Sequence, residues 1–117
     1  SRFKNIVNLP ESNQNTKTGW LAFPLTIKNN LKFNRKDFQI FFEKNNIQTR
    51  TIFTGNILKQ PAMKGLKHNS KKDAGNNSNY VMKNGILLGC HHGLSIKDLN
   101  YITNTFLKFL KSKKYKT

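Results

Sequence analysis

Apolar and other residues alternate along positions 20–27, which is the period of a β-strand with one buried face. Pro24 lies within this stretch and has no backbone N–H to donate to a neighbouring strand. The strand is therefore expected to lie at a sheet edge or to contain a bulge at that residue. Alternation returns at residues 47–53, and residues 86–88 form a short apolar run suited to a strand buried on both faces. The hydrophobic pattern therefore predicts three strands.

Two further segments have the apolar spacing of amphipathic helices, and each begins with a capping box. Asn34 and Asp37 form the first box, and the helix that follows is expected to end near residue 45. Ser95 and Asp98 form the second box. The apolar positions at helical spacing are Phe38, Phe41 and Phe42 in the first helix and Leu99, Ile102, Phe106, Phe109 and Leu110 in the second. The sequence therefore predicts two helices with one buried face each.

Residues 64–79 are rich in Lys, Asn, Ser and Gly with almost no apolar content, which predicts an exposed loop. Residues 80–83 are expected to form a helical turn that Asn84 and Gly85 terminate. The order of elements is then strand, helix, strand, long loop, strand and helix. This order predicts the α+β class, with a small three-stranded sheet covered by helices.

The length of 117 residues bounds the chain to one small domain with a single modest core. Lys and Arg number 21 against 5 acids, and the resulting net charge of +16 would attract nucleic acid, anionic lipid or phosphorylated metabolites. Many of the lysines stand beside asparagines, a pattern that an A/T-rich coding sequence also produces. Charge alone therefore leaves both explanations open.

The single cysteine, Cys90, excludes an internal disulfide and a cysteine pair for zinc, which favours a reducing compartment. No apolar run approaches the roughly 20 residues that span a bilayer, and the N-terminus lacks a signal-peptide core. We therefore expect a cytoplasmic protein without a membrane partner. Because the chain begins at Ser1 and opens with polar residues, we also expect it to be a piece of a longer polypeptide.

A loop crowded with polar donors follows the second predicted strand. Arg50 lies where strand and loop meet, and its planar guanidinium suits a phosphate or a carboxylate, although a solvated strand-end arginine is the simpler explanation. Asn56 and Gln60 offer amide donors and acceptors that a sugar or a nucleobase can satisfy. Such a loop is more typical of a binding surface than of a plain connection.

A second cluster, residues 89–95, places adjacent His91 and His92 after the third strand. On an extended backbone the two rings point in opposite directions, so at most one can enter a given pocket. His91 is expected to be either a ligand contact or a structural turn histidine. A zinc site and a nucleophilic pair with Cys90 are both weakly supported. Since the acids make no catalytic pair and no phosphate-loop motif is present, we assign no catalytic residue and no metal ligand to this chain.

Residues 18–112 resemble the C-terminal small domain of the DegT/DnrJ/StrS family of pyridoxal-phosphate (PLP) sugar aminotransferases, which have fold type I. The likeness rests on residues 20–26, on residues 89–95 and, most specifically, on the Thr-Arg, Gly-Asn and Gln-Pro spacing within residues 47–61. Within the family, the chain is most similar to the CDP-6-deoxyhexulose 3-dehydrase branch of lipopolysaccharide biosynthesis.

The resemblance implies that residues 1–19 are a linker from an N-terminal PLP-binding domain, that residues 20–112 are the small domain and that residues 113–117 are a basic tail. It implies a cofactor, PLP or pyridoxamine phosphate (PMP), bound mainly outside this chain, where the catalytic lysine or histidine would also lie. It further implies a nucleotide-diphosphate sugar as substrate, a homodimer and, for the dehydrase branch, an iron–sulfur reductase as partner.

The implied activity is 3-dehydration of a CDP-4-keto-6-deoxyhexose for dideoxysugar synthesis, with transamination of a nucleotide sugar as the alternative. His92 stands where proline is common and Tyr80 where some dehydrases have an arginine, which leaves the branch and the sugar open. Substrate-side roles carry over to the positions that match the family pattern, which are Arg50, Phe53, Asn56, Gln60 and His91.

A basic nucleic-acid-binding module is the alternative from another class, because the charge and the interspersed phenylalanines support it. Most of these phenylalanines fall on predicted core faces, and no recognised nucleic-acid motif is present. A docking domain without a ligand of its own is a third hypothesis. Nucleic acid is therefore the weaker prediction of partner.

Overall fold

The computed structural model describes residues 3–69 and 75–115, and its centre is a small antiparallel sheet. The four strands lie in the order β1 (Val7–Asn8), β2 (Phe23–Ile27), β4 (Gly85–Leu88) and β3 (Thr49–Thr51). The predicted α+β class with a small sheet is confirmed, but the prediction of three strands is wrong. The additional strand, β1, has only two residues, which is too short for alternation to signal it in the sequence.

Pro24 lies at a position of β2 that has a hydrogen-bonded neighbour on one side only. Its Cα partner is Leu87 of β4, whereas β1 pairs with β2 only at Thr26 and Ile27. The missing backbone donor of Pro24 therefore leaves no gap in a ladder, and the predicted need for an edge position is met.

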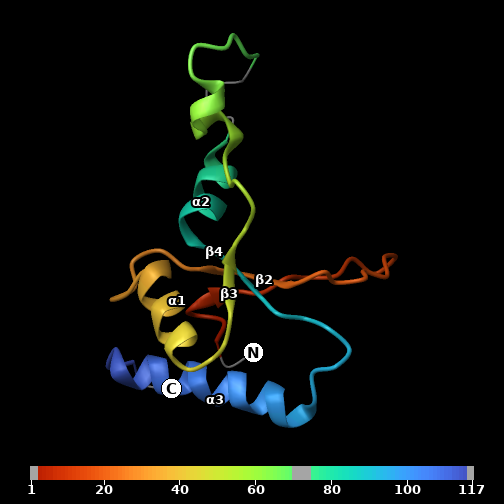
Figure 1. The fold of residues 1–117 in the computed structure, drawn as a ribbon, viewed down its shortest axis with the longest axis vertical. Helices are drawn as coiled ribbons and strands as arrows, with labels where there is room; N and C mark the ends of the chain where they lie inside the picture. Colours follow the sequence, from red (N-terminus) through yellow and green to blue (C-terminus); the bar gives the residue numbers. More distant parts are fainter. Residues whose placement is uncertain (1–2, 70–74, 116–117) are drawn as a thin grey trace.

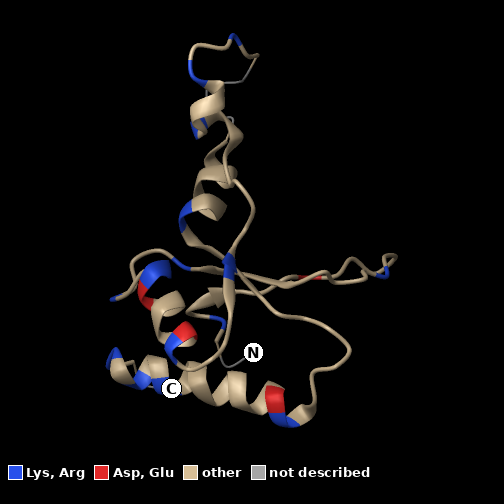
Figure 2. Cartoon of the chain, viewed as in Figure 1, with Lys and Arg blue, Asp and Glu red and all other residues tan. Residues whose placement is uncertain are grey.

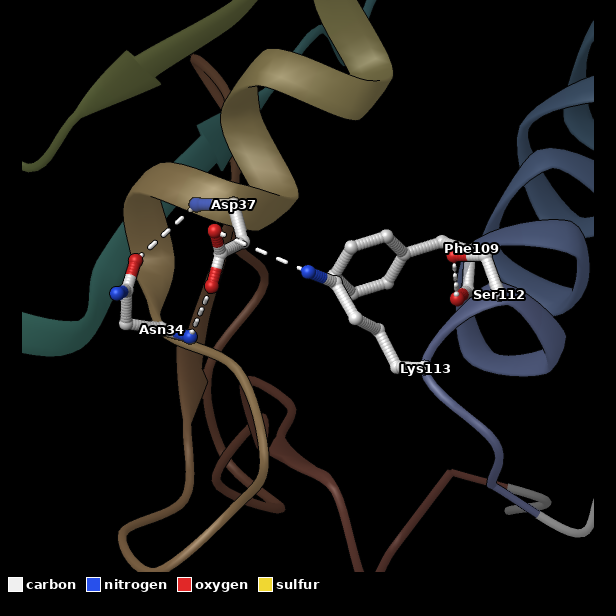
Figure 3. A network of polar contacts seen from close by, with 5 residues as sticks. All are labelled: Asn34, Asp37, Phe109, Ser112 and Lys113. Atoms are coloured by element: carbon white, nitrogen blue, oxygen red, sulfur yellow. Dashed lines mark hydrogen bonds and ion pairs between the residues drawn. The ribbon is translucent and has the colours of Figure 1, made fainter.

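In the part of the chain that the structure describes, three α-helices accompany the sheet, α1 (Arg35–Lys44), α2 (Asn76–Asn84) and α3 (Ile96–Ser112). Both predicted capping boxes are present. The Asn34 side chain accepts a hydrogen bond from the Asp37 backbone at 3.1 Å, and the Asp37 carboxylate accepts one from the Asn34 backbone at 3.0 Å (Figure 3). Ser95 and Asp98 make the same reciprocal pair at the start of α3. These boxes satisfy backbone donors that the first turn of a helix leaves free.

The core lies between the sheet and the pair α1 and α3, and aromatic rings fill most of it. Phe38 and Phe42 stack at 4.0 Å between ring centroids, and the edges of Phe106 and Phe109 meet Phe38 at 5.2 and 5.4 Å. Such offset and edge-to-face contacts add to the burial of apolar area. The predicted buried faces of both helices are confirmed for these four residues, each at most 7% exposed.

The two faces of the sheet have different roles because side chains alternate along each strand. Leu25, Ile86 and Leu88 belong to the buried core. Arg50, Leu87 and Pro24 are cross-strand partners in one row, at the alternate positions that face away from this core. Arg50 is therefore exposed while its neighbour Thr49 is buried.

A segment that we call the arm, with described residues 53–69 and 75–84, projects from the sheet between the end of β3 and the start of β4 (Figure 1). Two short 3-10 helices, η1 (Ile57–Lys59) and η2 (Pro61–Met63), lie on its outgoing side, and α2 lies on its returning side. A second extended segment, residues 9–22, leaves the other side of the sheet. These projections raise the radius of gyration to 16.3 Å, against about 13 Å for a compact domain of about 100 residues.

The helix α2 begins earlier than the predicted turn at residues 80–83, and residues 70–74 of the predicted loop lie outside the described residues. Its N-cap is Gly75, with φ at 95° and no side-chain cap, so the sequence carries no start signal. Tertiary contacts hold it instead. The Tyr80 hydroxyl donates to the Ile27 carbonyl at 2.9 Å, and the Asn84 amide donates to the Asn29 side chain at 3.2 Å.

The expected basic tail is partly packed, and residues 116–117 lie outside the described residues. The Tyr115 hydroxyl accepts a hydrogen bond from the Lys32 backbone at 2.7 Å, and its ring meets the edge of Phe33. Lysines and arginines recur on the arm, on α1 and on α3 rather than on one element (Figure 2). Within residues 3–69 and 75–115, none of the helices has the length and hydropathy that a bilayer-crossing segment requires.

Candidate functional site

A hollow of about 430 Å³ opens where β3 and β4 meet the first half of α3. Arg50 and Gln48 line it from β3 and the residue before that strand, Leu87 lines it from β4, and His91 lines it from the loop that follows β4. Asp98 and Tyr101 of α3 contribute to its far side. The hollow therefore combines an apolar surface with several polar side chains, which is the usual composition of a small-molecule site.

Arg50 owes its position to the way in which its neighbour Thr49 is fixed to α1. Thr49 is 7% exposed, and Glu43 accepts hydrogen bonds from its backbone amide at 2.6 Å and from its hydroxyl at 2.9 Å. Gln39 donates to the same hydroxyl at 3.2 Å. Because Thr49 faces the core, the next side chain must face the opposite side of the strand. The guanidinium of Arg50 is thereby directed away from the core.

His91 has the structural turn role that the sequence offered as one of two possibilities. Its Nδ1 accepts a hydrogen bond from the Gly93 backbone at 3.1 Å, so it closes a local turn. An acceptor at Nδ1 places the proton of the neutral ring on Nε2, which is then a donor. His91 lines the hollow, and its neighbour His92 does not.

The acidic residue in the hollow has its carboxylate engaged at the start of α3. The Ser95 hydroxyl and backbone amide donate to Asp98 at 2.6 and 2.8 Å. These hydrogen bonds, with smaller contributions from the charges of Lys97 and His91, lower the pKa of Asp98. Asp98 is therefore a capping carboxylate, and its lowered pKa makes it a poor proton donor near neutral pH.

Asn56 and Gln60 lie on the arm and do not line the hollow. Asn56 is 5% exposed; its Nδ2 donates to the Asn79 side chain at 2.9 Å, and its Oδ1 accepts from the Leu58 backbone at 3.0 Å. Gln60 Nε2 donates to the Thr54 carbonyl at 2.7 Å. Both amides thus make contacts that shape the arm. Of the five predicted substrate-side residues, Arg50 and His91 line this hollow, whereas Phe53, Asn56 and Gln60 do not.

Phe53 lies at the base of the arm, in a second depression of about 380 Å³ that we call the alcove. Gln60, Thr51 and Thr54 also line the alcove, together with Arg35 of α1. The sequence analysis did not select Arg35 as a candidate residue. The available signal was its residue type, since arginine is rare in this lysine-rich chain.

The residues of the hollow do not fit the attachment of the cofactor that the family resemblance implies. PLP enzymes hold their cofactor through a lysine, with a further partner for the ring nitrogen. Lysine is absent from the described residues that line the hollow, and its carboxylate, Asp98, is bonded to Ser95. The hollow therefore lacks the residue that would attach PLP covalently.

Residues 2–107 match the DegT/DnrJ/EryC1/StrS aminotransferase family. The lipopolysaccharide biosynthesis protein RfbH of Salmonella typhimurium (strain LT2) is 28% identical over 104 residues, which are 89% of this chain and 24% of that protein. The dTDP-4-dehydro-2,6-dideoxy-D-glucose 3-dehydratase of Saccharopolyspora spinosa is 28% identical over 102 residues, which are 87% of this chain and 22% of that protein. The chain thus spans about a quarter of the length of these relatives.

Solved structures share the fold at lower identity. A GDP-4-keto-6-deoxymannose-3-dehydratase with a trapped PLP-glutamate geminal diamine superimposes with a TM-score of 0.76 at 23% identity, over 89% of this chain and 27% of that one. A DegT DnrJ EryC1 StrS aminotransferase from Brucella abortus gives 0.72 at 20% identity, over 92% and 27%. These similarities show that the fold recurs as one part of larger chains.

Proposed function

Because the chain belongs to the DegT/DnrJ/EryC1/StrS aminotransferase family, we propose that it is the C-terminal small domain of a PLP- or PMP-dependent enzyme that acts on a nucleotide sugar. In this proposal, residues 20–112 are the small domain, residues 1–19 connect it to a cofactor-binding domain, and residues 113–117 are a basic tail. The cofactor is held by another part of the full-length polypeptide, which fits the lack of a lysine among the described residues of the hollow.

The reaction we propose is 3-dehydration of a CDP-4-keto-6-deoxyhexose in the synthesis of dideoxysugars for lipopolysaccharide. The names of two relatives support it, since one is a lipopolysaccharide biosynthesis protein and the other a sugar 3-dehydratase. Transamination of a nucleotide sugar is the second candidate, and the similarity of fold to an aminotransferase from Brucella abortus favours it. A cytoplasmic homodimer is part of the proposal, and an iron–sulfur reductase as partner stays a prediction.

The structural observation that best supports the proposal is that Arg50 and His91 line the same hollow. Arg50 supplies a fixed positive charge with several donors, suited to a phosphate or a sugar oxygen. His91 supplies an Nε2 donor whose orientation is set by the bond from the Gly93 amide to Nδ1. Leu87 offers an apolar surface for the carbon face of a sugar ring. The small domain would thus bind and orient the substrate.

The experiment that tests this function uses the full-length polypeptide with added PMP or PLP. It is incubated with CDP-4-keto-6-deoxyglucose, with and without glutamate as amino donor, and the products are identified by mass spectrometry. Loss of the hydroxyl at C3 supports dehydration, and glutamate-dependent gain of an amino group supports transamination. A protein that does neither with this substrate or with the GDP- and dTDP-linked 4-keto sugars, both with and without an added iron–sulfur reductase and its electron donor, would overturn the proposed function.

A further inference from the structure

The loop between β2 and α1 lies against the C-terminal end of α3. The Tyr115 hydroxyl accepts a hydrogen bond from the Lys32 backbone at 2.7 Å, across 83 positions of sequence. The Phe33 ring meets the rings of Phe109 and Tyr115 edge to face, at 4.7 and 5.6 Å between centroids. Two segments that are far apart in the sequence therefore lie side by side at one end of the molecule.

Exposed lysines gather at this end, on the loop, in the first turn of α1 and along the last turns of α3 (Figure 2). We call them the basic end: Lys32, Lys36, Lys108, Lys111 and Lys114. Asp37 also lies here, and its carboxylate is already 3.8 Å from Nζ of Lys113 (Figure 3). This is the only ion pair within residues 3–69 and 75–115, so no described acid pairs with a lysine of the basic end. The basic end therefore presents an uncompensated positive potential.

Helix stability accounts for only part of this arrangement. A helix C-terminus favours cations, so Lys111 and Lys114 suit the end of α3. Lys36 lies in the first turn of α1, where the helix dipole disfavours a cation, and Lys32 lies in a loop. A coding bias toward lysine would raise the number of lysines without bringing those of distant segments to one end. Because like charges repel, the arrangement costs stability that a bound polyanion would offset.

The side chains of the basic end favour a lipid surface over nucleic acid. All five are lysines, whose ammonium groups are flexible point charges suited to a diffuse negative surface, whereas arginine is the usual residue for nucleic-acid recognition. The aromatic rings at this end are not free to stack on bases. Phe33 and Phe109 are buried, and the Tyr115 ring packs on Phe33 with its hydroxyl bonded to Lys32. Single-stranded nucleic acid would therefore meet charge here but no stacking platform.

We propose that the basic end attaches the protein to an anionic lipid surface. Clusters of lysines bind anionic phospholipid headgroups through charge alone, and each lysine near the surface adds to the affinity. The sequence predicted no membrane partner because no apolar run is long enough to cross a bilayer, but attachment by charge at the surface needs no such run. The inference is independent of the proposed function, because none of the five lysines lines the hollow.

The test uses the full-length polypeptide and two kinds of vesicle, one of phosphatidylcholine alone and one of equal parts of phosphatidylcholine and phosphatidylglycerol. Co-sedimentation should show binding to the second kind only, and added salt should weaken it by screening the attraction.

A combined variant of the basic end should weaken this binding about tenfold or more. It carries four substitutions: Lys32→Gln, Lys36→Gln, Lys111→Gln and Lys114→Gln. The matched control removes the same number of charges from exposed lysines of the arm, and it should bind nearly as the parent protein does. Its substitutions are Lys59→Gln, Lys64→Gln, Lys67→Gln and Lys83→Gln. Both variants should keep the circular dichroism spectrum of the parent, because the replaced lysines are all exposed.

Binding of the parent protein to neither kind of vesicle, or equally to both, would overturn the proposal. An equal loss in the two variants would also overturn it, because the total charge and not the basic end would then be responsible. Tighter binding to mixed-sequence RNA or DNA than to the anionic vesicles, at equal phosphate concentration, would replace the lipid surface by nucleic acid as the partner. None of these results bears on the proposed function, since dehydration and amination of the sugar are measured without lipid.

Discussion

The guanidinium of Arg35 donates to the backbone carbonyl of Met82 at 2.6 Å, so the first turn of α1 is tied directly to the helix α2 of the arm. The two residues are 47 positions apart in the sequence. The bond is partly buried and charge-assisted, which makes it stronger than an ordinary surface hydrogen bond. It is one of the contacts through which the packed core sets the direction of the arm.

Replacing Arg35 by methionine should loosen the arm while leaving the core folded. The Met82 carbonyl would lose its charged donor, at a cost of about 1–3 kcal/mol. Hydrogen exchange of the α2 amides should accelerate, and that of α3 should not. Lys36→Met, at the exposed neighbouring residue, is the control. Equal exchange of α2 in both variants would contradict a role for Arg35 in holding the arm.

Thr49→Val should lower the free energy of unfolding by about 1–2 kcal/mol. Valine keeps the shape of this buried residue but removes the hydroxyl that donates to Glu43 and accepts from Gln39. Urea denaturation followed by circular dichroism measures the change. Thr51→Val, two residues along the same strand and exposed, should be nearly neutral. A loss as large for Thr51→Val as for Thr49→Val would count against the anchoring of β3 through Thr49.

Gly55→Ala should destabilise the arm more than Gly65→Ala does. Both glycines have positive φ, +65° and +82°, so both variants carry the left-handed strain of about 1–2 kcal/mol. The Cβ at Gly55 would also overlap Met82, whereas nothing lies within 4 Å of the Cβ position at Gly65. The additional overpacking should cost about 1–3 kcal/mol more. Local opening energies from hydrogen exchange of the arm amides distinguish the two variants, and equal values would refute the contact.

The capping of α3 should give the protein a stability component that disappears in acid. The pKa of Asp98 is lowered from 3.8 by hydrogen bonds from Ser95 and by the charges of Lys97 and His91. Its contribution is complete above the unfolded-state pKa and is lost as the pH falls below that value and through the lower folded-state pKa. Urea midpoints measured from pH 7 downward should fall less steeply below about pH 4 for Ser95→Ala than for the parent chain. Parallel profiles would contradict this coupling.

Under the proposed function, Arg50→Met in the full-length polypeptide should weaken substrate binding without changing stability, because the Arg50 side chain is exposed and lines the hollow. Loss of a charge-assisted contact of about 1.5–3 kcal/mol corresponds to a rise in KM or Kd of about 10- to 150-fold. Lys59→Met, an exposed cation on the arm that does not line the hollow, is the matched control. An unchanged KM would remove Arg50 from the proposed site.

The predicted helices and their capping boxes are confirmed because their signals are local in the sequence. Asn34 with Asp37, and Ser95 with Asp98, satisfy donors within one turn of their own helices. The phenylalanines of α1 and α3 repeat at helical spacing, so their burial follows from periodicity. The resemblance to the family was likewise carried by short segments, and the match over residues 2–107 confirms it.

The tertiary structure decided what no local signal could. The strand β1 exists because Val7 pairs with Ile27, and α2 forms on an uncapped segment because Tyr80 and Asn84 find partners far away in the sequence. The sequence predicted one binding site in the polar loop after the second strand, but the tertiary structure places the residues of that loop in two separate regions. Because side chains alternate along β3, Arg50 faces the hollow. The loop that follows belongs to the arm, where Gly55 packs against Met82 and Asn56 bonds to Asn79. The sequence determines which functional groups the chain carries, but long-range packing determines which of these groups lie in contact.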